Sequence, residues 1–285
     1  MPDQKTEPPH FPKKSHFLHA KQEKVVVRGQ HDIAYNVTPH SALDEHIIKN
    51  GIYGDWIANQ DVIQIAKDAV IFDVGANAGF LSLIFAKRYA PNGAVYAYEP
   101  DPVIFEQLQE NLAVNDSIKN LFLNQIALQD DPGKTESLFN IRRAIDGDAN
   151  ENCGLSSLLN IQLHTVDRVT VNVSTLDKEV SSLSLQRLDF IKIDVEGCEN
   201  IVLAGGRHSI IQFKPTILWE FSRIIDKLSG NRNSTESFSY LSELGYLHFA
   251  ISETEGLKAA LSPDDLVADL NILSFHQEKI PNNLR

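Results

Sequence analysis

"AVIFDVGANAGFLSLIFAKRYA" (residues 69–90) holds the clearest structural signals in the chain. Residues 69–75 are a short β-rich run that ends in glycine, and residues 79–90 are apolar at helical spacing until Pro-Asn-Gly (91–93) ends the helix. A strand, a glycine loop and a helix in this order predict the first half of a βαβ unit. A loop in this position points backbone N–H groups and a helix N-terminus at a ligand.

The alternation of strands and helices continues along the chain. Residues 94–100 and 121–128 read as strands, and residues 102–115 form an amphipathic helix between them. Further strands are predicted at 188–194, 216–221, 246–251 and 270–275, and further helices at 199–209 and 235–244. This order predicts an α/β fold with a parallel sheet, whose ligands bind at the C-terminal ends of the strands.

The chain divides into three parts, namely a basic, flexible tail (1–24), a helical segment that covers the site (25–68) and the α/β domain (69–285). The middle part is predicted from helix signals at 41–56. Within the α/β domain, residues 129–187 are less regular than the rest. The polar stretch 142–158 in this region is predicted to be a long loop near the ligand face, because loops of that length are often functional.

The composition excludes several classes of protein. The 285 residues carry a formal net charge of −12, so the chain lacks the broad basic surface of a nucleic-acid binder. No apolar run approaches the roughly 18 residues of a membrane span, and the first residues lack the apolar region of a secretory signal. The only two cysteines, Cys153 and Cys198, make a cytoplasmic location the simplest prediction.

Two classes of cofactor compete for the glycine loop. A dinucleotide fingerprint that starts at Gly75 needs glycine two residues later, where the chain has Asn77. Asp73 would also repel a pyrophosphate, whereas it suits S-adenosylmethionine, which carries an ammonium and a sulfonium group and no phosphate. Glu99 ends the second strand and can accept both hydroxyls of a ribose. The loop therefore favours S-adenosylmethionine over a nicotinamide dinucleotide.

Four segments in this order resemble the FkbM family of S-adenosylmethionine-dependent methyltransferases: "FDVGANAGFLSLIFAK", "AYEPDPVIFEQLQENL", "STLDKEV" and "LDFIKIDVEGCENIVLAGG". The resemblance covers roughly residues 69–276. It implies a Rossmann-like class I methyltransferase fold, in which helices flank a seven-stranded, mostly parallel sheet whose last strand is antiparallel. It makes residues 69–285 the methyltransferase domain.

The same resemblance implies contacts with the cofactor. The residues around its methionine part would be Asp73, Gly75, Asn77 and Gly79. Glu99 would take the ribose, and the turn at Ala127 and Leu128 would approach the adenine. Members of the family typically methylate hydroxyl groups, often on sugars or natural products.

The stretch "DFIKIDVEGCE" (189–199) supplies the catalytic candidates. In an extended strand alternate side chains share a face, so Lys192, Asp194 and, if the extension continues, Glu196 line up at the ligand edge. Lys192 is the expected counter-ion of these carboxylates, and Glu220 at the end of the next strand can join them. The carboxylates can position the sulfonium and the acceptor, remove a proton, or hold a divalent metal. Positioning is favoured, with Asp194 nearest the chemistry and also in contact with the cofactor, and no metal is assigned.

These observations predict an S-adenosylmethionine-dependent O-methyltransferase acting on a small-molecule or glycan acceptor, and not on nucleic acid. The alternative is a non-catalytic domain that binds S-adenosylmethionine and regulates a partner. The acceptor, the choice between oxygen and nitrogen, and a homo-oligomeric state are left open. His248, which falls in a predicted strand, is interpreted as structural and not as a catalytic base.

Overall fold

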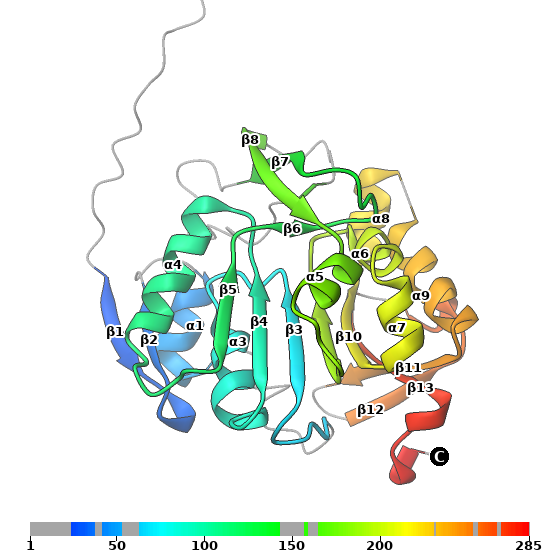
Figure 1. The fold of residues 1–285 in the computed structure, drawn as a ribbon, viewed down its shortest axis with the longest axis horizontal. Helices are drawn as coiled ribbons and strands as arrows, with labels where there is room; N and C mark the ends of the chain where they lie inside the picture. The colour runs from blue at the N-terminus through cyan, green and yellow to red at the C-terminus, as the bar shows by residue number, and fades with distance from the viewer. Residues whose placement is uncertain are drawn as a thin grey trace, which may run out of the picture.

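The computed structural model describes residues 24–37, 42–52, 63–142, 157–158, 165–230, 232–252, 256–266 and 269–284. An eight-stranded sheet lies at its centre, with helices on both sides (Figure 1). In spatial order its strands are β12 (Gly256–Ala260), β11 (Tyr246–Ser252), β13 (Leu270–His276), β10 (Thr216–Phe221), β9 (Phe190–Ile193), β3 (Val70–Val74), β4 (Ala94–Tyr98) and β5 (Leu121–Asn124).

The directions of the strands confirm the predicted mostly parallel sheet. Strands β5, β4, β3, β9 and β10 pair parallel to one another. The last strand, β13, is antiparallel to both of its neighbours, β10 and β11. The seven expected strands are therefore all present. An eighth strand, β12, which the sequence did not predict, pairs antiparallel with β11 at the edge.

Helices cover both faces because each central strand is apolar on both sides. Ile71 and Phe72 are consecutive in β3 and fully buried, and they belong to different hydrophobic clusters. The helices around the sheet are α1 (Ala42–Asn50), α3 (Phe80–Ile84), the π-helical turn η2 (Phe85–Tyr89), α4 (Pro102–Ala113), α5 (Leu176–Ser182), α6 (Glu199–Ala204), α7 (Arg207–Phe213), α8 (Arg223–Ser229) and α9 (Asn233–Glu243).

A second, three-stranded sheet lies beyond the C-terminal ends of the parallel strands (Figure 1). The predicted strand 121–128 divides into β5 and β6 (Ala127–Leu128), and β6 leaves the central sheet to pair with β8 (Thr165–Ser174). Strand β7 (Glu136–Arg142) pairs antiparallel with β8. We call this second sheet, β6–β8–β7, the arm. Most of the predicted loop 142–158 lies outside the described residues.

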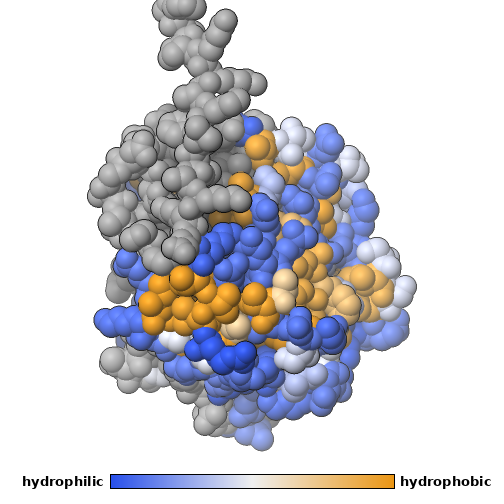
Figure 2. Space-filling view, turned by 90° about the vertical axis from the view of Figure 1, so that its left-hand side faces the viewer, coloured by the Kyte–Doolittle hydropathy of each residue, from blue (hydrophilic) through white to orange (hydrophobic). Residues whose placement is uncertain are grey.

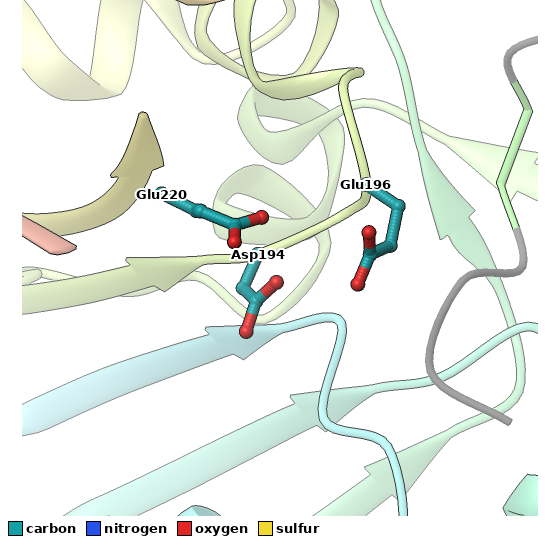
Figure 3. A group of neighbouring side chains, drawn as sticks. All are labelled: Asp194, Glu196 and Glu220. Carbon is teal, nitrogen blue, oxygen red and sulfur yellow. The ribbon is translucent and has the colours of Figure 1, made fainter. Parts of the chain in front are cut away.

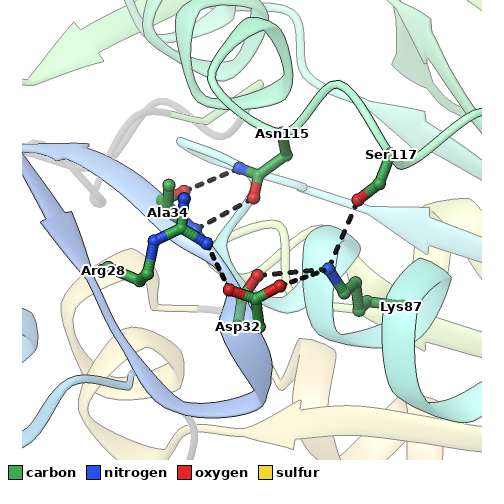
Figure 4. Close-up of polar contacts among 6 residues, drawn as sticks. All are labelled: Arg28, Asp32, Ala34, Lys87, Asn115 and Ser117. Carbon is green, nitrogen blue, oxygen red and sulfur yellow. Dashed lines mark hydrogen bonds and ion pairs between the residues drawn. The ribbon is translucent and has the colours of Figure 1, made fainter.

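The N-terminal segment contains more than the predicted helix. A hairpin of β1 (Val25–Arg28) and β2 (Ala34–Val37), joined by η1 (Gln30–Asp32), precedes α1. The side chain of Asn115 donates to Ala34 O at 2.7 Å and accepts from Ala34 N at 2.9 Å (Figure 4). Lys87 Nζ donates to Asp32 O at 3.1 Å. The hairpin thus packs against the domain, while its role as a cover of the site stays a prediction.

The surface on the side of β1 is partly apolar. Figure 2 shows a band of hydrophobic residues across this face, between hydrophilic regions. Val25 and Val26 of β1 are among the exposed large hydrophobic residues of the chain. Within the described residues, no helix is both long enough and apolar enough to cross a membrane.

A buried polar network links β10, α9, β11 and β13. His248 is 4% exposed, with its Nδ1 2.8 Å from Ser274 Oγ and its Nε2 3.0 Å from Ser242 Oγ. Trp219 Nε1 donates to Ser274 Oγ at 2.9 Å, and the Phe238 ring packs on the imidazole. Burial lowers the pKa of His248 to about 4. These contacts agree with the structural interpretation of this histidine.

We expect His248 to make the fold less stable in acid. The unfolded chain binds a proton at this histidine below pH about 6.5, whereas the folded chain binds it only near pH 4, so acid favours unfolding. Between about pH 6.5 and pH 5 the wild-type free energy of unfolding should fall about 1.5 kcal/mol further than that of His248→Gln. Urea unfolding at both pH values measures the difference, and parallel pH dependences of the two proteins would contradict the assignment.

Candidate functional site

The glycine loop lies between β3 and α3, at the C-terminal edge of the sheet. Its backbone is left-handed at Gly75 (φ 75°), Asn77 (φ 51°) and Gly79 (φ 83°). A Cβ atom at Gly79 would lie 2.1 Å from Leu108 Cδ1, so this glycine serves the packing of the loop against α4. Glycine suits positions 75 and 79 because the chain reverses sharply between the strand and the helix and takes a left-handed conformation there.

The loop does not point its backbone N–H groups at a ligand, and this part of the prediction was wrong. The N–H groups of Gly75 and Ala76 both donate to Tyr98 O at 3.0 Å. Asn77 N donates to Glu99 Oε2 at 2.9 Å, and Gly79 N donates to Ala76 O at 2.9 Å. Ala78 N donates to the side chain of Asn77. Because the protein satisfies all five donors, the loop is no cradle for a phosphate, and a cofactor without phosphate fits it better.

Glu99 joins this loop to the start of α4. It is 7% exposed, and its carboxylate accepts hydrogen bonds from Asn77 N and from Asp101 N, both at 2.9 Å. Burial raises the pKa of Glu99 to about 7, against the effect of these two hydrogen bonds. The N-cap of α4 is Asp101, so Glu99 is not used as a helix cap. A carboxylate has about four acceptor positions, so Glu99 keeps capacity for ribose hydroxyls.

Asp73 and Lys192 form the floor of the site. Asp73 is fully buried, accepts from Ser82 Oγ at 2.5 Å and lies 3.5 Å from Lys192 Nζ. Lys192 is 5% exposed, donates to Gly75 O at 2.6 Å and lies 3.4 Å from Asp194 Oδ2. Lys192 is therefore the counter-ion of Asp194, as predicted, and also of Asp73. The contact of Asp73 with the methionine part of a cofactor stays a prediction.

Three carboxylates gather where β9 and β10 end. Asp194, Glu196 and Glu220 each place an oxygen within 4.8 Å of the others, and their carboxyl groups converge (Figure 3). Glu196 does not continue the strand, because its φ of 56° is left-handed. The predicted face of alternating residues therefore ends at Asp194, and a turn brings Glu196 to the cluster instead. Glu220 joins Asp194 as expected.

The cluster holds more negative charge than Lys192 can balance. Burial, and then the neighbouring Asp194, raise the pKa of Glu196 well above its usual range. The same causes raise the pKa of Glu220 to about 8. A raised pKa makes the carboxylate form of such a group a stronger base toward an acceptor hydroxyl. The three groups also offer the hard oxygen ligands that a divalent cation prefers, and the expectation of no metal stays a prediction.

The arm brings further residues to this edge. Ala127 and Leu128 are buried in β6 and pair with β8, so their approach to an adenine stays a prediction. A cavity of about 170 Å³ separates the arm from the connections that follow β4 and β5. It is lined by Pro100, Pro102, Gln125, Glu136, Val169, Thr170, Val171 and Asn172. The arm therefore lines a cavity at this edge of the sheet, which the sequence did not reveal.

Sequence reasoning also missed two residues that hold the turn carrying Glu196. Glu199 accepts from Val195 N and Gly197 N, and Asn233 donates to Gly197 O. A carboxylate two residues after Gly197 could have indicated the role of Glu199 from the sequence. Asn233 lies 36 residues from Gly197 in the chain, and no local pattern connects the two.

Comparison with known proteins agrees with this geometry. A family described as the methyltransferase FkbM domain matches residues 73–247, which include the end of β3 and all of β4, β9 and β10. Methyltransferase sdnD of Sordaria araneosa is 27% identical over 186 residues, covering 58% of this chain and 70% of that protein. The 2-O-methyltransferase NoeI of Sinorhizobium fredii is 28% identical over 151 residues, covering 50% of this chain and 59% of that protein.

A solved structure with a related name is a more distant match. The crystal structure of methyltransferase FkbM from Methylobacillus flagellatus KT has a TM-score of 0.47 and 16% sequence identity to this chain. The match covers 79% of this chain and 48% of the solved one, so the chain spans about half the length of that protein. The family match spans more than half of the chain and includes the glycine loop, Glu99 and the carboxylate cluster. On this basis the chain belongs to the FkbM methyltransferase family.

Proposed function

We propose that this protein transfers a methyl group from S-adenosylmethionine to a hydroxyl group of a sugar, a natural product or another small acceptor. The observation that carries the proposal is the acidic C-terminal edge of the central sheet. Glu99 and the carboxylate cluster lie there beside the glycine loop, whose backbone N–H groups donate to other groups of the protein. The names of two matched relatives support an oxygen acceptor. NoeI is named a 2-O-methyltransferase, and FkbM of Streptomyces tacrolimicus is named a 31-O-demethyl-FK506 methyltransferase. The small number of cysteines supports a cytoplasmic location.

The residues present fit this cofactor. S-adenosylmethionine combines a ribose, an ammonium group and a sulfonium group, and when bound it supplies the methyl group. Glu99 would accept the ribose hydroxyls, and Asp194, which Lys192 only partly balances, would face the positive groups. No phosphate has to be neutralised, which agrees with the saturated N–H groups of the loop.

The chain would act mainly by positioning. Asp194 would orient the acceptor oxygen in line with the methyl carbon and the sulfur, so that two reactants meet in one geometry. Glu196 or Glu220 would take the hydroxyl proton as the oxygen attacks, because a raised pKa makes the carboxylate form a stronger base. The acceptor would be a small molecule or glycan and not a nucleic acid, since the net charge of −12 repels a phosphate backbone.

Calorimetric titration with S-adenosylmethionine and S-adenosylhomocysteine, with and without magnesium, tests the cofactor. We expect binding of both without the metal, and the absence of heat in every titration would overturn the proposal. Transfer of a labelled methyl group to a panel of hydroxylated glycosides and polyketides then tests the reaction. Binding without any transfer would favour the second candidate, a regulatory domain that senses S-adenosylmethionine.

We expect Glu99→Ala to weaken S-adenosylhomocysteine binding about tenfold to a hundredfold. The variant removes a charged acceptor of hydrogen bonds, and such bonds contribute about 1.5–3 kcal/mol. Asp101→Ala is the matched control, because it removes a carboxylate two residues away that caps α4. The control should lose about 1 kcal/mol of stability and keep its affinity. Equal losses of affinity in the two variants would show that Glu99 does not contact the ribose.

A further inference from the structure

Val195, Glu196 and Gly197 form a turn within the connection from β9 to α6, and we call it the VEG turn. Glu199, the first residue of α6, reaches back over it and is 1% exposed. Its Oε1 accepts from Val195 N at 3.0 Å and from Gly197 N at 3.3 Å. A single buried oxygen thus fixes the N–H groups on both sides of Glu196.

The carbonyl groups of the turn are fixed as well, from elsewhere in the chain. Ser157 Oγ donates to Val195 O at 3.2 Å, and Asn233 Nδ2, at the start of α9, donates to Gly197 O. Ser157 is 1% exposed and Asn233 is 6% exposed. Side chains from three separate segments therefore bond the backbone on both sides of Glu196.

Glu196 itself differs from this framework. Its left-handed backbone (φ 56°) costs a residue with a side chain roughly 1–2 kcal/mol, so the surroundings must hold it in place. Within the described residues, its carboxyl group makes no hydrogen bond or ion pair, although it lies beside Asp194 and Glu220 (Figure 3). A firmly held turn that carries a carboxylate without a hydrogen-bond partner among the described residues is typical of a group that binds a ligand.

We propose that Glu199, assisted by Asn233 and Ser157, is a positioning residue that fixes Glu196 against the point where the methyl group passes to the acceptor. The inference rests on the proposed function and specifies which carboxylate faces the transferred methyl. Without Glu199 the two N–H groups would lose their acceptor, and the turn could relax to an ordinary right-handed backbone. The side chain of Glu196 would then leave the cluster.

The affinities of two cofactor analogues report the position of the Glu196 carboxyl group, and their measurement requires no methyl acceptor. Sinefungin carries an amine where S-adenosylmethionine carries its transferable methyl group, and this amine is protonated near neutral pH. S-adenosylhomocysteine has no group at that point. A carboxyl group held at the methyl position is ionised by the ammonium group that it faces, and their attraction favours sinefungin. The same carboxyl group leaves S-adenosylhomocysteine unaffected. The ratio of the two dissociation constants, measured by calorimetry, therefore reports where the charge of Glu196 lies.

We expect the wild-type protein to prefer sinefungin about tenfold, and Glu196→Gln to lose most of that preference. Glu199→Ala should lose it to the same extent and keep its affinity for S-adenosylhomocysteine within about twofold. Glu199→Gln should retain the preference, since its amide oxygen can accept both N–H groups. Asp177→Ala is the control, because Asp177 accepts N–H groups at the start of α7, away from the turn.

The double variant Glu196→Gln/Glu199→Ala separates positioning from general damage. If Glu199 acts only through Glu196, the double variant should be no worse than Glu196→Gln alone. Asn233→Ala, which releases Gly197 O, serves the same test if Glu199→Ala does not fold. A full preference for sinefungin in Glu199→Ala and Asn233→Ala, or additive losses in the double variant, would overturn the inference. A wild-type protein that binds neither analogue would instead overturn the proposed function.

Discussion

Replacing Gly75 by alanine should weaken the binding of S-adenosylhomocysteine by about a hundredfold and destabilise the fold. A Cβ atom at this position would lie 1.8 Å from Asp194 O and 2.9 Å from Asp194 C. Both are backbone atoms at the end of β9, so no side chain can move aside to make room. The strand ends would have to separate. Displacements of about 1 Å at a reacting centre can cost a hundredfold in rate, and we expect a loss of similar size in binding.

Gly230→Ala is the matched control for this substitution. Gly230 has the same left-handed backbone (φ 72°), but a Cβ atom there would meet nothing within 4 Å. Both variants therefore lose about 1–2 kcal/mol from their backbone conformation, and only Gly75→Ala adds the collision. We expect urea unfolding to show a further loss of about 2 kcal/mol or more for Gly75→Ala. Equal stability of the two variants would show that β3 and β9 tolerate separation.

The sequence predicted seven of the eight strands of the central sheet, because most residues of these strands are apolar. Residues 69–75 became β3, and residues 216–221 became β10, with the bounds Val70–Val74 and Thr216–Phe221. A strand that is buried on both faces can be recognised from its own apolar residues, without knowing which strands it pairs with. The ligand edge followed from the same pattern, since the C-terminal ends of parallel strands meet at one edge.

The contacts within the site could not be predicted in this way. The N–H groups of Gly75 and Ala76 turn to Tyr98 O, which belongs to a neighbouring strand. Glu196 was expected on the face of Asp194 if the strand extended, but a left-handed turn held by Glu199 and Asn233 places it instead. In each case the decisive partner is fixed by tertiary packing, which local propensity does not encode.

The arm and the N-terminal hairpin escaped prediction for a related reason. Strand β1 is mostly exposed, and β7 and β8 pair mainly with one another, so neither shows the long apolar runs of the central strands. Strands of this kind are defined by their neighbours more than by their own residues. The hairpin is nevertheless part of the fold, because Ile33, Tyr35 and Val37 belong to the same core cluster as Phe80.

Lys192→Met is expected to cause the largest loss of stability of any single substitution considered for the site. Lys192 is buried, holds Gly75 O, and lies 3.5 Å from Asp73 and 3.4 Å from Asp194. Removing one partner of a buried ion pair leaves an uncompensated charge and typically costs about 3–5 kcal/mol. Methionine fills a similar volume, so the loss measures charge and hydrogen bonding more than packing. Lys178→Met, at an exposed position, should change stability by less than about 0.5 kcal/mol.

The loss should grow with pH, and its sign follows from the carboxylates. Lys192 lowers the pKa of Glu99, Glu196 and Glu220, which burial raises, so its removal raises these pKa values further. A carboxyl group with a raised pKa stabilises the fold while it is protonated, and this contribution disappears as the pH rises through the folded pKa. Urea unfolding should therefore show a larger difference between wild type and Lys192→Met at about pH 8.5 than at about pH 5.5. A difference that is constant or shrinks with pH would show that Lys192 does not set the charge of the site.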